Sequence, residues 1–420
     1  MNIFSKLNPG EIALVTTFEE KSHYCRLNKS QVRHLGSIHQ INYTLHLWKE
    51  DKYTRGTVTE EKNLEELLLE LRKQIPYLSV DEYTTYPSSF QSEDSEEKSL
   101  TLDQKAFEKS LRSLLGSIQK VQATGLFMES ALNYSIHDSL GNKKQYSHSS
   151  LFFDYSLIRY PLSAKGIYCS PSWDFDKWQK NLNETIYYLE HLKPNLKSLK
   201  PDHYDVYFGP EAIADLLSLF SWNGVSQAAV QENKSFLKEE KTFSPLFSLQ
   251  ENFNLGLSPH FNELGIISPL KVPLITEGKW IDSLTSPRSA LKYKKTSHGA
   301  LESESLRSAE ILPGTHTTSY KEMKKGIYIP YVHYLNWSDA HQGRCTGMTR
   351  FHCFFIEDGE IKDNIQPIRF DESLYHIFGK NLIALDKDTK LIYEVGTYGS
   401  RQFGGVKVPG ALVKDVNFTF

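Results

Sequence analysis

The stretch DVYFGPEAIADLLSLFSW, residues 205–222, decides how the second half of the chain is organised. Its first residues are largely apolar or aromatic and end at a glycine, which predicts a short strand. Pro210 follows at a first-turn position, where its missing N–H costs nothing, so a helix is expected to begin there. We therefore place the start of a C-terminal domain at about residue 203 and expect residues 203–420 to be rich in strands.

The segment that comes first, residues 1–86, is expected to combine strands with a helix. In INYTLHLWK, residues 41–49, apolar and polar side chains alternate, as in a half-buried strand. Asn63 and Glu66 then have the spacing of a helix N-cap and its N3 partner, and leucines recur at helical spacing until Pro76. These features predict a strand followed by an amphipathic helix.

A Ser-rich and acidic segment, residues 87–104, separates this unit from the next one. It has too few aliphatic side chains to offset its ordering entropy and is predicted to be a linker or mobile loop. Residues 105–200 are expected to hold a helix near 104–119, a strand at 151–160 and a helix with an apolar stripe, formed by Phe175, Trp178, Leu182, Ile186, Leu189 and Leu192. The predicted fold class is α+β, with an N-terminal α/β domain in two parts followed by a β-rich C-terminal domain.

The composition excludes several classes of protein. Lys and Arg number 48 against 51 Asp and Glu, which gives a formal charge of -3 and favours neither nucleic acid nor an anionic membrane as partner. Four cysteines in 420 residues are too few for a disulfide framework and fit a reducing compartment. No apolar stretch is long enough to span a membrane, and the start lacks the apolar core of a signal peptide. We expect a soluble, cytoplasmic protein.

Familiar catalytic and cofactor signatures are absent. The chain contains no GxxxxGK[ST], no strand-linked GxGxxG, no CxxC pair and no HExxH or HExxxH. One cluster of soft ligands, His341, Cys345, His352 and Cys353, could in principle hold zinc. Its spacing fits no common zinc module, and adjacent residues on a strand point to opposite faces. Buried thiols and strand-face histidines are therefore favoured over a metal site.

Two further patterns leave alternatives open. No GxSxG elbow marks a nucleophile, and Cys25 is better interpreted as a half-buried strand thiol, although partners of a catalytic triad need not be close in sequence. The aromatic run IYIPYVHYLNW, residues 327–337, lacks the basic neighbours that base stacking would need. Such a dense apolar run must be covered, either by the sheet of this chain or by a second subunit.

The residues quoted so far, with others in the same order, resemble the TldD/PmbA (TldE) family. The run CTGMTRFHCFFIEDGEIKDNIQPIRFDES, residues 345–373, is similar to the family's TG-x-[ST]-R turn and the strand after it, and GTYGSRQFGGVKVPGALVKDV resembles its closing segment. At the N-terminus, CRLNKSQVRHLG resembles an arginine-asparagine strand turn of the family. The resemblance covers nearly the whole chain, and residues 87–104 are the least alike.

The resemblance also implies what this chain lacks. The family's active subunit carries an HExxxH helix whose histidines, with a later cysteine, hold zinc. The matching positions here are Pro210, Glu211 and Asp215, with Tyr398 at the cysteine position, so all three ligands are replaced and only the glutamate remains. This departure places the chain with the TldE-like members that lack the zinc motif. Glu211 itself lies in the first turn of a predicted helix, where the macrodipole stabilises it without any catalytic role.

The resemblance implies a function for the chain as a subunit. We expect a non-metallated subunit without zinc or another cofactor of its own, paired with a zinc-bearing TldD-type subunit in a cytoplasmic metallopeptidase that acts on unfolded peptides or peptide precursors. A stand-alone homodimeric binding protein without protease activity is the alternative. A third possibility is hydrolysis by this chain itself through Glu211, Asp215 or the His341 and Cys345 cluster.

Overall fold

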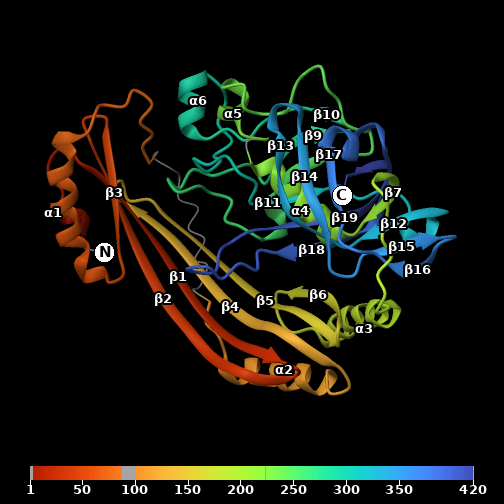
Figure 1. Cartoon of the computed structure of the whole chain (residues 1–420). Helices are drawn as coiled ribbons and strands as arrows, with labels where there is room; N and C mark the ends of the chain where they lie inside the picture. Colours follow the sequence, from red (N-terminus) through yellow and green to blue (C-terminus); the bar gives the residue numbers. More distant parts are fainter. Residues whose placement is uncertain (1–2, 88–99, 223, 420) are drawn as a thin grey trace.

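The computed structural model describes residues 3–87, 100–222 and 224–419 and divides them into two lobes, each built on one sheet (Figure 1). Most of the predicted linker, residues 88–99, lies outside the described residues. Both lobes combine helices with sheets, so the α+β prediction is confirmed.

The N-terminal lobe is a six-stranded antiparallel sheet in the order β3-β2-β1-β4-β5-β6. Its strands are β1 Ile12–Asn28, β2 Gln31–Lys49, β3 Lys52–Val58, β4 Gln122–Asp138, β5 Lys143–Arg159 and β6 Leu162–Ser170. The pairing of β1 with β4 runs from Leu14 opposite Asp138 to Leu27 opposite Gly125. The two predicted parts of the N-terminal domain therefore share one continuous sheet.

Three helices pack against this sheet: α1 Leu64–Gln74, α2 Gln104–Ser117 and α3 Phe175–His191. Asn63 is the N-cap residue of α1 as predicted, but it makes no side-chain cap hydrogen bond, because it ends a 3-10 turn and has helical backbone angles. The leucine face of α1 is buried as predicted. In α3 the stripe is buried at Trp178 and Leu182, but Phe175 is the first helical residue and remains exposed.

The C-terminal lobe is a 13-stranded mixed sheet whose main path runs β10-β9-β8-β11-β19-β7-β12-β15-β16. Its strands are β7 Asp202–Phe208, β8 Leu249–Asn252, β9 Lys271–Thr276, β10 Lys279–Trp280, β11 Ser308–Ile311, β12 Lys325–Ile329, β13 Tyr331–Asp339, β14 Arg344–Arg350, β15 Phe354–Glu357, β16 Glu360–Asn364, β17 Arg369–Ser373, β18 Leu382–Tyr393 and β19 Gly405–Phe418. The helices of this lobe are α4 Pro210–Ser221, α5 Gln227–Gln231 and α6 Pro287–Tyr293.

The decisive strand and helix, β7 and α4, form as predicted and lie at the centre of this lobe. β7 is paired on both sides, with β19 and with β12, which suits its apolar residues. Gly209 caps α4, Pro210 is its first residue, and the apolar face of the helix packs against β13 and β19. Burial of a large apolar side chain contributes roughly 1.5–3 kcal/mol, so a face with Ile213, Leu216 and Phe220 fixes the helix firmly.

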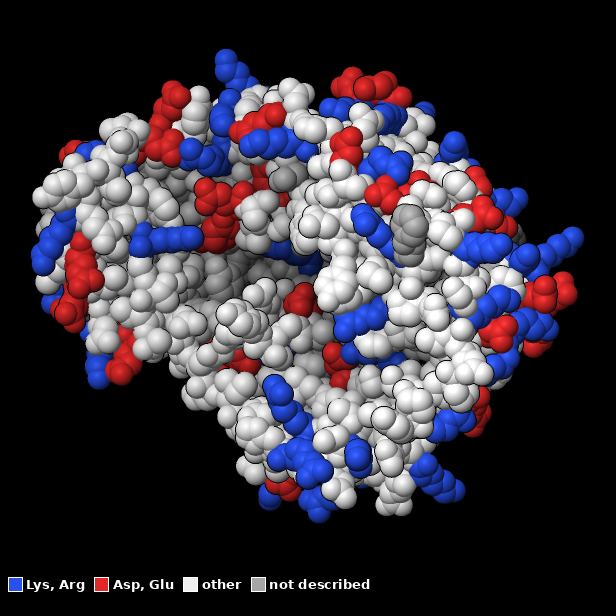
Figure 2. All heavy atoms as spheres, in the orientation of Figure 1, with Lys and Arg blue, Asp and Glu red and all other residues white. Residues whose placement is uncertain are grey.

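A loop between β18 and β19, residues 394–404, joins the lobes, and we call it the crossing loop. The backbone N–H of Arg401 donates to Glu20 of β1 at 2.8 Å, and the Gln40 amide of β2 donates to the carbonyl of Gly399 at 3.1 Å. The Arg401 guanidinium is buried and donates to the carbonyls of Glu394 and Gly396, which holds the loop in shape. The visible face of the molecule is hollowed between the lobes, and side chains of both charges gather there (Figure 2).

Candidate functional site

The start of α4 carries a group of polar side chains at the junction of the lobes. Lys390 on β18 donates to Oε1 of Glu211 at 2.5 Å, and the side chains of Glu211 and Lys390 are 12% and 30% exposed. β18 lies between the two lobes and packs against β6, which brings Cys169 close to the pair (Figure 1). We call Glu211, Asp215, Lys390 and Cys169 the α4 cluster.

Electrostatics in the α4 cluster follow from burial and from this ion pair. Burial lowers the pKa of Lys390, but the Glu211 and Glu184 carboxylates outweigh that effect, and the net pKa is raised. Burial raises the pKa of the Cys169 thiol to about 11, so the thiol stays protonated near neutrality. The cluster thus holds a fixed cation beside a protonated thiol, which is a poor nucleophile in that form.

Asp215 lies one turn after Glu211 on the same helix. Burial raises the pKa of Asp215 to about 7, and the negative Glu211 adds to this, while the backbone N–H of Val332 and the positive Arg350 oppose it. A carboxyl group with such a pKa can exchange a proton near neutral pH. Of the positions that sequence analysis marked, the structure therefore brings Glu211 and Asp215 together.

The donor set around α4 does not fit zinc. The Pro210 side chain has no metal-ligating atom, and the Glu211 carboxylate is already engaged by an ammonium group. Tyr398 lies in the crossing loop with its side chain fully exposed, at 100%, so it does not pack against the buried Glu211 carboxylate. Within residues 3–87, 100–222 and 224–419, no group of three or more His, Cys, Asp or Glu side chains is arranged to hold a metal ion.

The second candidate cluster is divided among different surroundings. Cys345 is buried on β14 in the core of the C-terminal lobe, and burial raises its pKa to about 12. His352 stacks on Tyr188 of α3 with ring centroids 4.9 Å apart and accepts the backbone N–H of Lys165 at 3.2 Å. Cys353 donates to the carbonyl of Arg350 at 3.2 Å, and His341 lies on an exposed 3-10 turn. Cys345, His352 and Cys353 have the properties of core residues.

Two other candidates from the sequence are also placed by the structure. Cys25 is fully buried on β1, and burial raises the pKa of its thiol to about 11. In the aromatic run 327–337, Tyr328 and Tyr331 are buried within this chain, whereas Tyr334 is 73% exposed. The chain itself therefore covers the start of that run.

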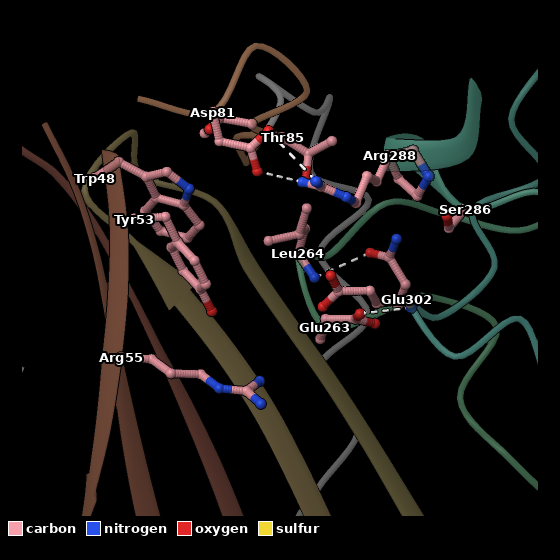
Figure 3. A pocket seen from close by; sticks show the side chains of 13 residues that line it. Trp48, Tyr53, Arg55, Asp81, Thr85, Glu263, Leu264, Ser286, Arg288 and Glu302 are labelled. Carbon is pink, nitrogen blue, oxygen red and sulfur yellow. Dashed lines mark hydrogen bonds and ion pairs between the residues drawn. The ribbon is translucent and has the colours of Figure 1, made fainter. Parts of the chain in front are cut away.

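One pocket was not marked by any sequence pattern. It is lined by Trp48, Tyr53 and Arg55 of the N-terminal sheet, by the loop around Asp81, and by Glu263, Arg288 and Glu302 of the C-terminal lobe (Figure 3). These residues come from five separate stretches of sequence, so no local motif could have revealed the pocket. We call it the Glu263 pocket.

In the described ranges, the helices are all too short or too polar to cross a membrane.

Comparisons with known proteins identify the fold and the family. The structure is similar to that of TldE from Thermococcus kodakarensis, with a TM-score of 0.81 and 14% identity over 100% of this chain and 98% of that one. It is also similar to a protein from Thermotoga maritima described as a modulator of DNA gyrase, with a TM-score of 0.77 and 16% identity over 98% of this chain and 96% of that one. A protein from Bacteroides thetaiotaomicron with the same description has a TM-score of 0.77 and 16% identity over 97% of this chain and 94% of that one. No curated protein matches the chain.

Residues 201–419 match the model of the PmbA/TldA metallopeptidase C-terminal domain. Because that match covers more than half of the sequence, the chain belongs to the PmbA/TldD metallopeptidase family.

Proposed function

We propose that this chain is the TldE/PmbA-like, non-metallated subunit of a peptidase whose zinc-bearing subunit is a separate TldD-type chain. The complex would act on unfolded peptides or peptide precursors, and this chain would shape the peptide groove and stabilise its partner. Zinc belongs to the partner in this proposal, and the α4 cluster of this chain does no hydrolysis by itself.

The observation that carries the proposal is the ion pair between Glu211 and Lys390. A glutamate can act as the general base of a metallopeptidase only if its carboxylate is free to take a proton from a metal-bound water. Here the carboxylate is the partner of an ammonium group in the interior of the molecule, and the neighbouring ligand positions offer Pro210 and a carboxyl group, that of Asp215. The ion pair with Lys390 therefore engages the carboxylate that a metal-bound water would need as its general base.

The shape of the molecule supports a role in holding peptides. The visible face is hollowed between the lobes (Figure 2). We place the proposed peptide groove in this hollow, because backbone groups can bond an extended peptide whatever its sequence.

The test compares the chain alone with the chain plus a TldD-type protein. The chain purified without added zinc is expected to contain no stoichiometric zinc by elemental analysis, and peptide hydrolysis is expected only in the mixture. Light scattering should show the chain entering a heteromeric complex. Hydrolysis by the chain alone, or no complex and no gain of hydrolysis in the mixture, would contradict the proposal.

A further inference from the structure

The Glu263 pocket contains a carboxylate that the protein satisfies only in part. Oε1 of Glu263 accepts the backbone N–H of Glu302 at 2.8 Å. Oε2 is buried and has no hydrogen-bond partner within the described part of the chain. A buried polar atom without a partner costs about 1–3 kcal/mol, so this oxygen is a place where a donor from a ligand would be stabilised.

The charges around the pocket favour a cation. The lining holds three acids, Asp81, Glu263 and Glu302, and two arginines, Arg55 and Arg288. Asp81 and Arg288 neutralise one another in an ion pair (Figure 3). Arg55 then opposes the carboxylates of Glu263 and Glu302. Two further arginines, Arg307 and Arg401, line an adjoining hollow. Each of them lies near a carboxylate outside the pocket, Glu251 for Arg307 and Glu394 for Arg401, so one negative charge of the pocket remains in excess. One monovalent cation would balance it.

The walls favour an organic cation over an inorganic one. Trp48 and Tyr53 form an aromatic wall, with ring centroids 5.1 Å apart, and cations are attracted to aromatic faces. Glu263 and Asn262 also line an adjoining hollow of about 350 Å³ that contains Phe18, Tyr134, Phe261 and Phe403. Its volume lies in the range of small-molecule sites, and its rings offer an apolar surface beside the carboxylate.

We propose that the Glu263 pocket binds an organic monocation with an apolar body. The ammonium group donates to Oε2 of Glu263 and faces Glu302, and the apolar body lies among the aromatic rings of the adjoining hollow. Both a free aromatic amine and the amino terminus of a peptide with an apolar first residue have this chemistry. The inference goes beyond the proposed subunit function, because it concerns a site away from the α4 cluster and needs no partner.

Calorimetric titration of the full chain tests the site with three probes: phenethylamine, the dipeptide amide Phe-Ala-NH2 with a free amino terminus, and the same dipeptide amide with an acetylated amino terminus. We expect saturable binding of at least one free amine and none of the acetylated probe. Binding of phenethylamine alone identifies a free amine as the ligand class, whereas binding of the dipeptide amide identifies a peptide terminus.

Matched variants assign the binding to Glu263. Glu263→Gln keeps the acceptor for the Glu302 N–H but removes the charge, and is expected to weaken binding by about tenfold or more. Glu239→Gln removes an exposed carboxylate on another loop and should leave binding unchanged. Circular dichroism checks that both variants are folded.

Equal binding of the acetylated probe, unchanged binding by Glu263→Gln, or no saturation up to about 10 mM would overturn the inference. None of these results depends on hydrolysis or on a partner, so they leave the proposed function to its own test.

Discussion

Two carboxylates at the junction of the lobes, those of Glu211 and Glu263, have opposite surroundings. Glu211 occupies a position that the family resemblance marks, yet its carboxylate is bound by Lys390. Glu263 occupies a position that no motif marks, yet one of its oxygens is buried without a partner in the described residues. The comparison teaches that an unsatisfied carboxylate is a better guide to a candidate ligand site than a motif position whose carboxylate is already paired.

The largest effect is expected from breaking the pair at α4. Lys390→Met leaves the Glu211 carboxylate without its cation in a mostly buried place, and should lower the free energy of unfolding by about 3 kcal/mol. Urea denaturation measures this. Adding Glu211→Gln should recover much of the loss, because no unpaired charge then remains.

An exposed ion pair provides the control for that measurement. Lys62 and Glu60 lie 2.5 Å apart with side chains 75% and 56% exposed. Lys62→Met should change the free energy of unfolding by only about 0.5 kcal/mol. If Lys390→Met lowers the free energy of unfolding by no more than this, the pair at α4 does not stabilise the fold, and the contrast between Glu211 and Glu263 fails.

A smaller effect is expected from the titration of Asp215. Burial raises its pKa to about 7, so the folded chain holds this proton more tightly than the unfolded chain does. Its contribution to stability is complete below the ordinary carboxyl pKa and is lost as the pH rises toward about 7. Between pH 5 and pH 8 the parent should therefore lose on the order of 2 kcal/mol of its free energy of unfolding through this group. The Asp215→Asn variant should not show that loss. Parallel pH profiles of the variant and the parent would disprove this.

Replacing the unsatisfied carboxylate of Glu263 should change the free energy of unfolding in the opposite direction to Lys390→Met. Burial raises the pKa of Glu263, so its charged form destabilises the folded chain. Without ligand at pH 8, Glu263→Gln is expected to raise the free energy of unfolding by about 1 kcal/mol, since it removes a charge that lacks a partner. Thermal unfolding detects the change, and a clear loss of stability would mean that the charge is already compensated.

The smallest effect is expected on activity. In a complex reconstituted with a TldD-type protein, Glu211→Gln should leave peptide hydrolysis within a few-fold, because a base held by Lys390 and without a metal-bound water has nothing to activate. Initial rates with an unfolded peptide measure this. A loss of about 100-fold would show that Glu211 takes part in catalysis and would remove the basis of the proposed function.

Local sequence patterns predicted the local elements well. The leucine spacing of α1 and the start of α4 at Pro210 depend on residues within a few turns of each other, and both are confirmed. The missing cap hydrogen bond at Asn63 depends on the preceding turn, whose conformation the motif does not specify. Long-range features were out of reach: β1 pairs with β4 across about a hundred residues, and Lys390 reaches Glu211 from 179 residues away. The Glu263 pocket could not be predicted for the same reason.

The bond between Lys390 and Glu211 also constrains how the chain can evolve. Histidines gained at positions 210 and 215 would surround a carboxylate that already holds an ammonium group, and a divalent ion placed there would be repelled by it. Loss of Lys390 before those gains would leave an unpaired carboxylate in the interior and a less stable chain. A chain with this pair could therefore gain a metal site at the start of α4 only through several coordinated substitutions.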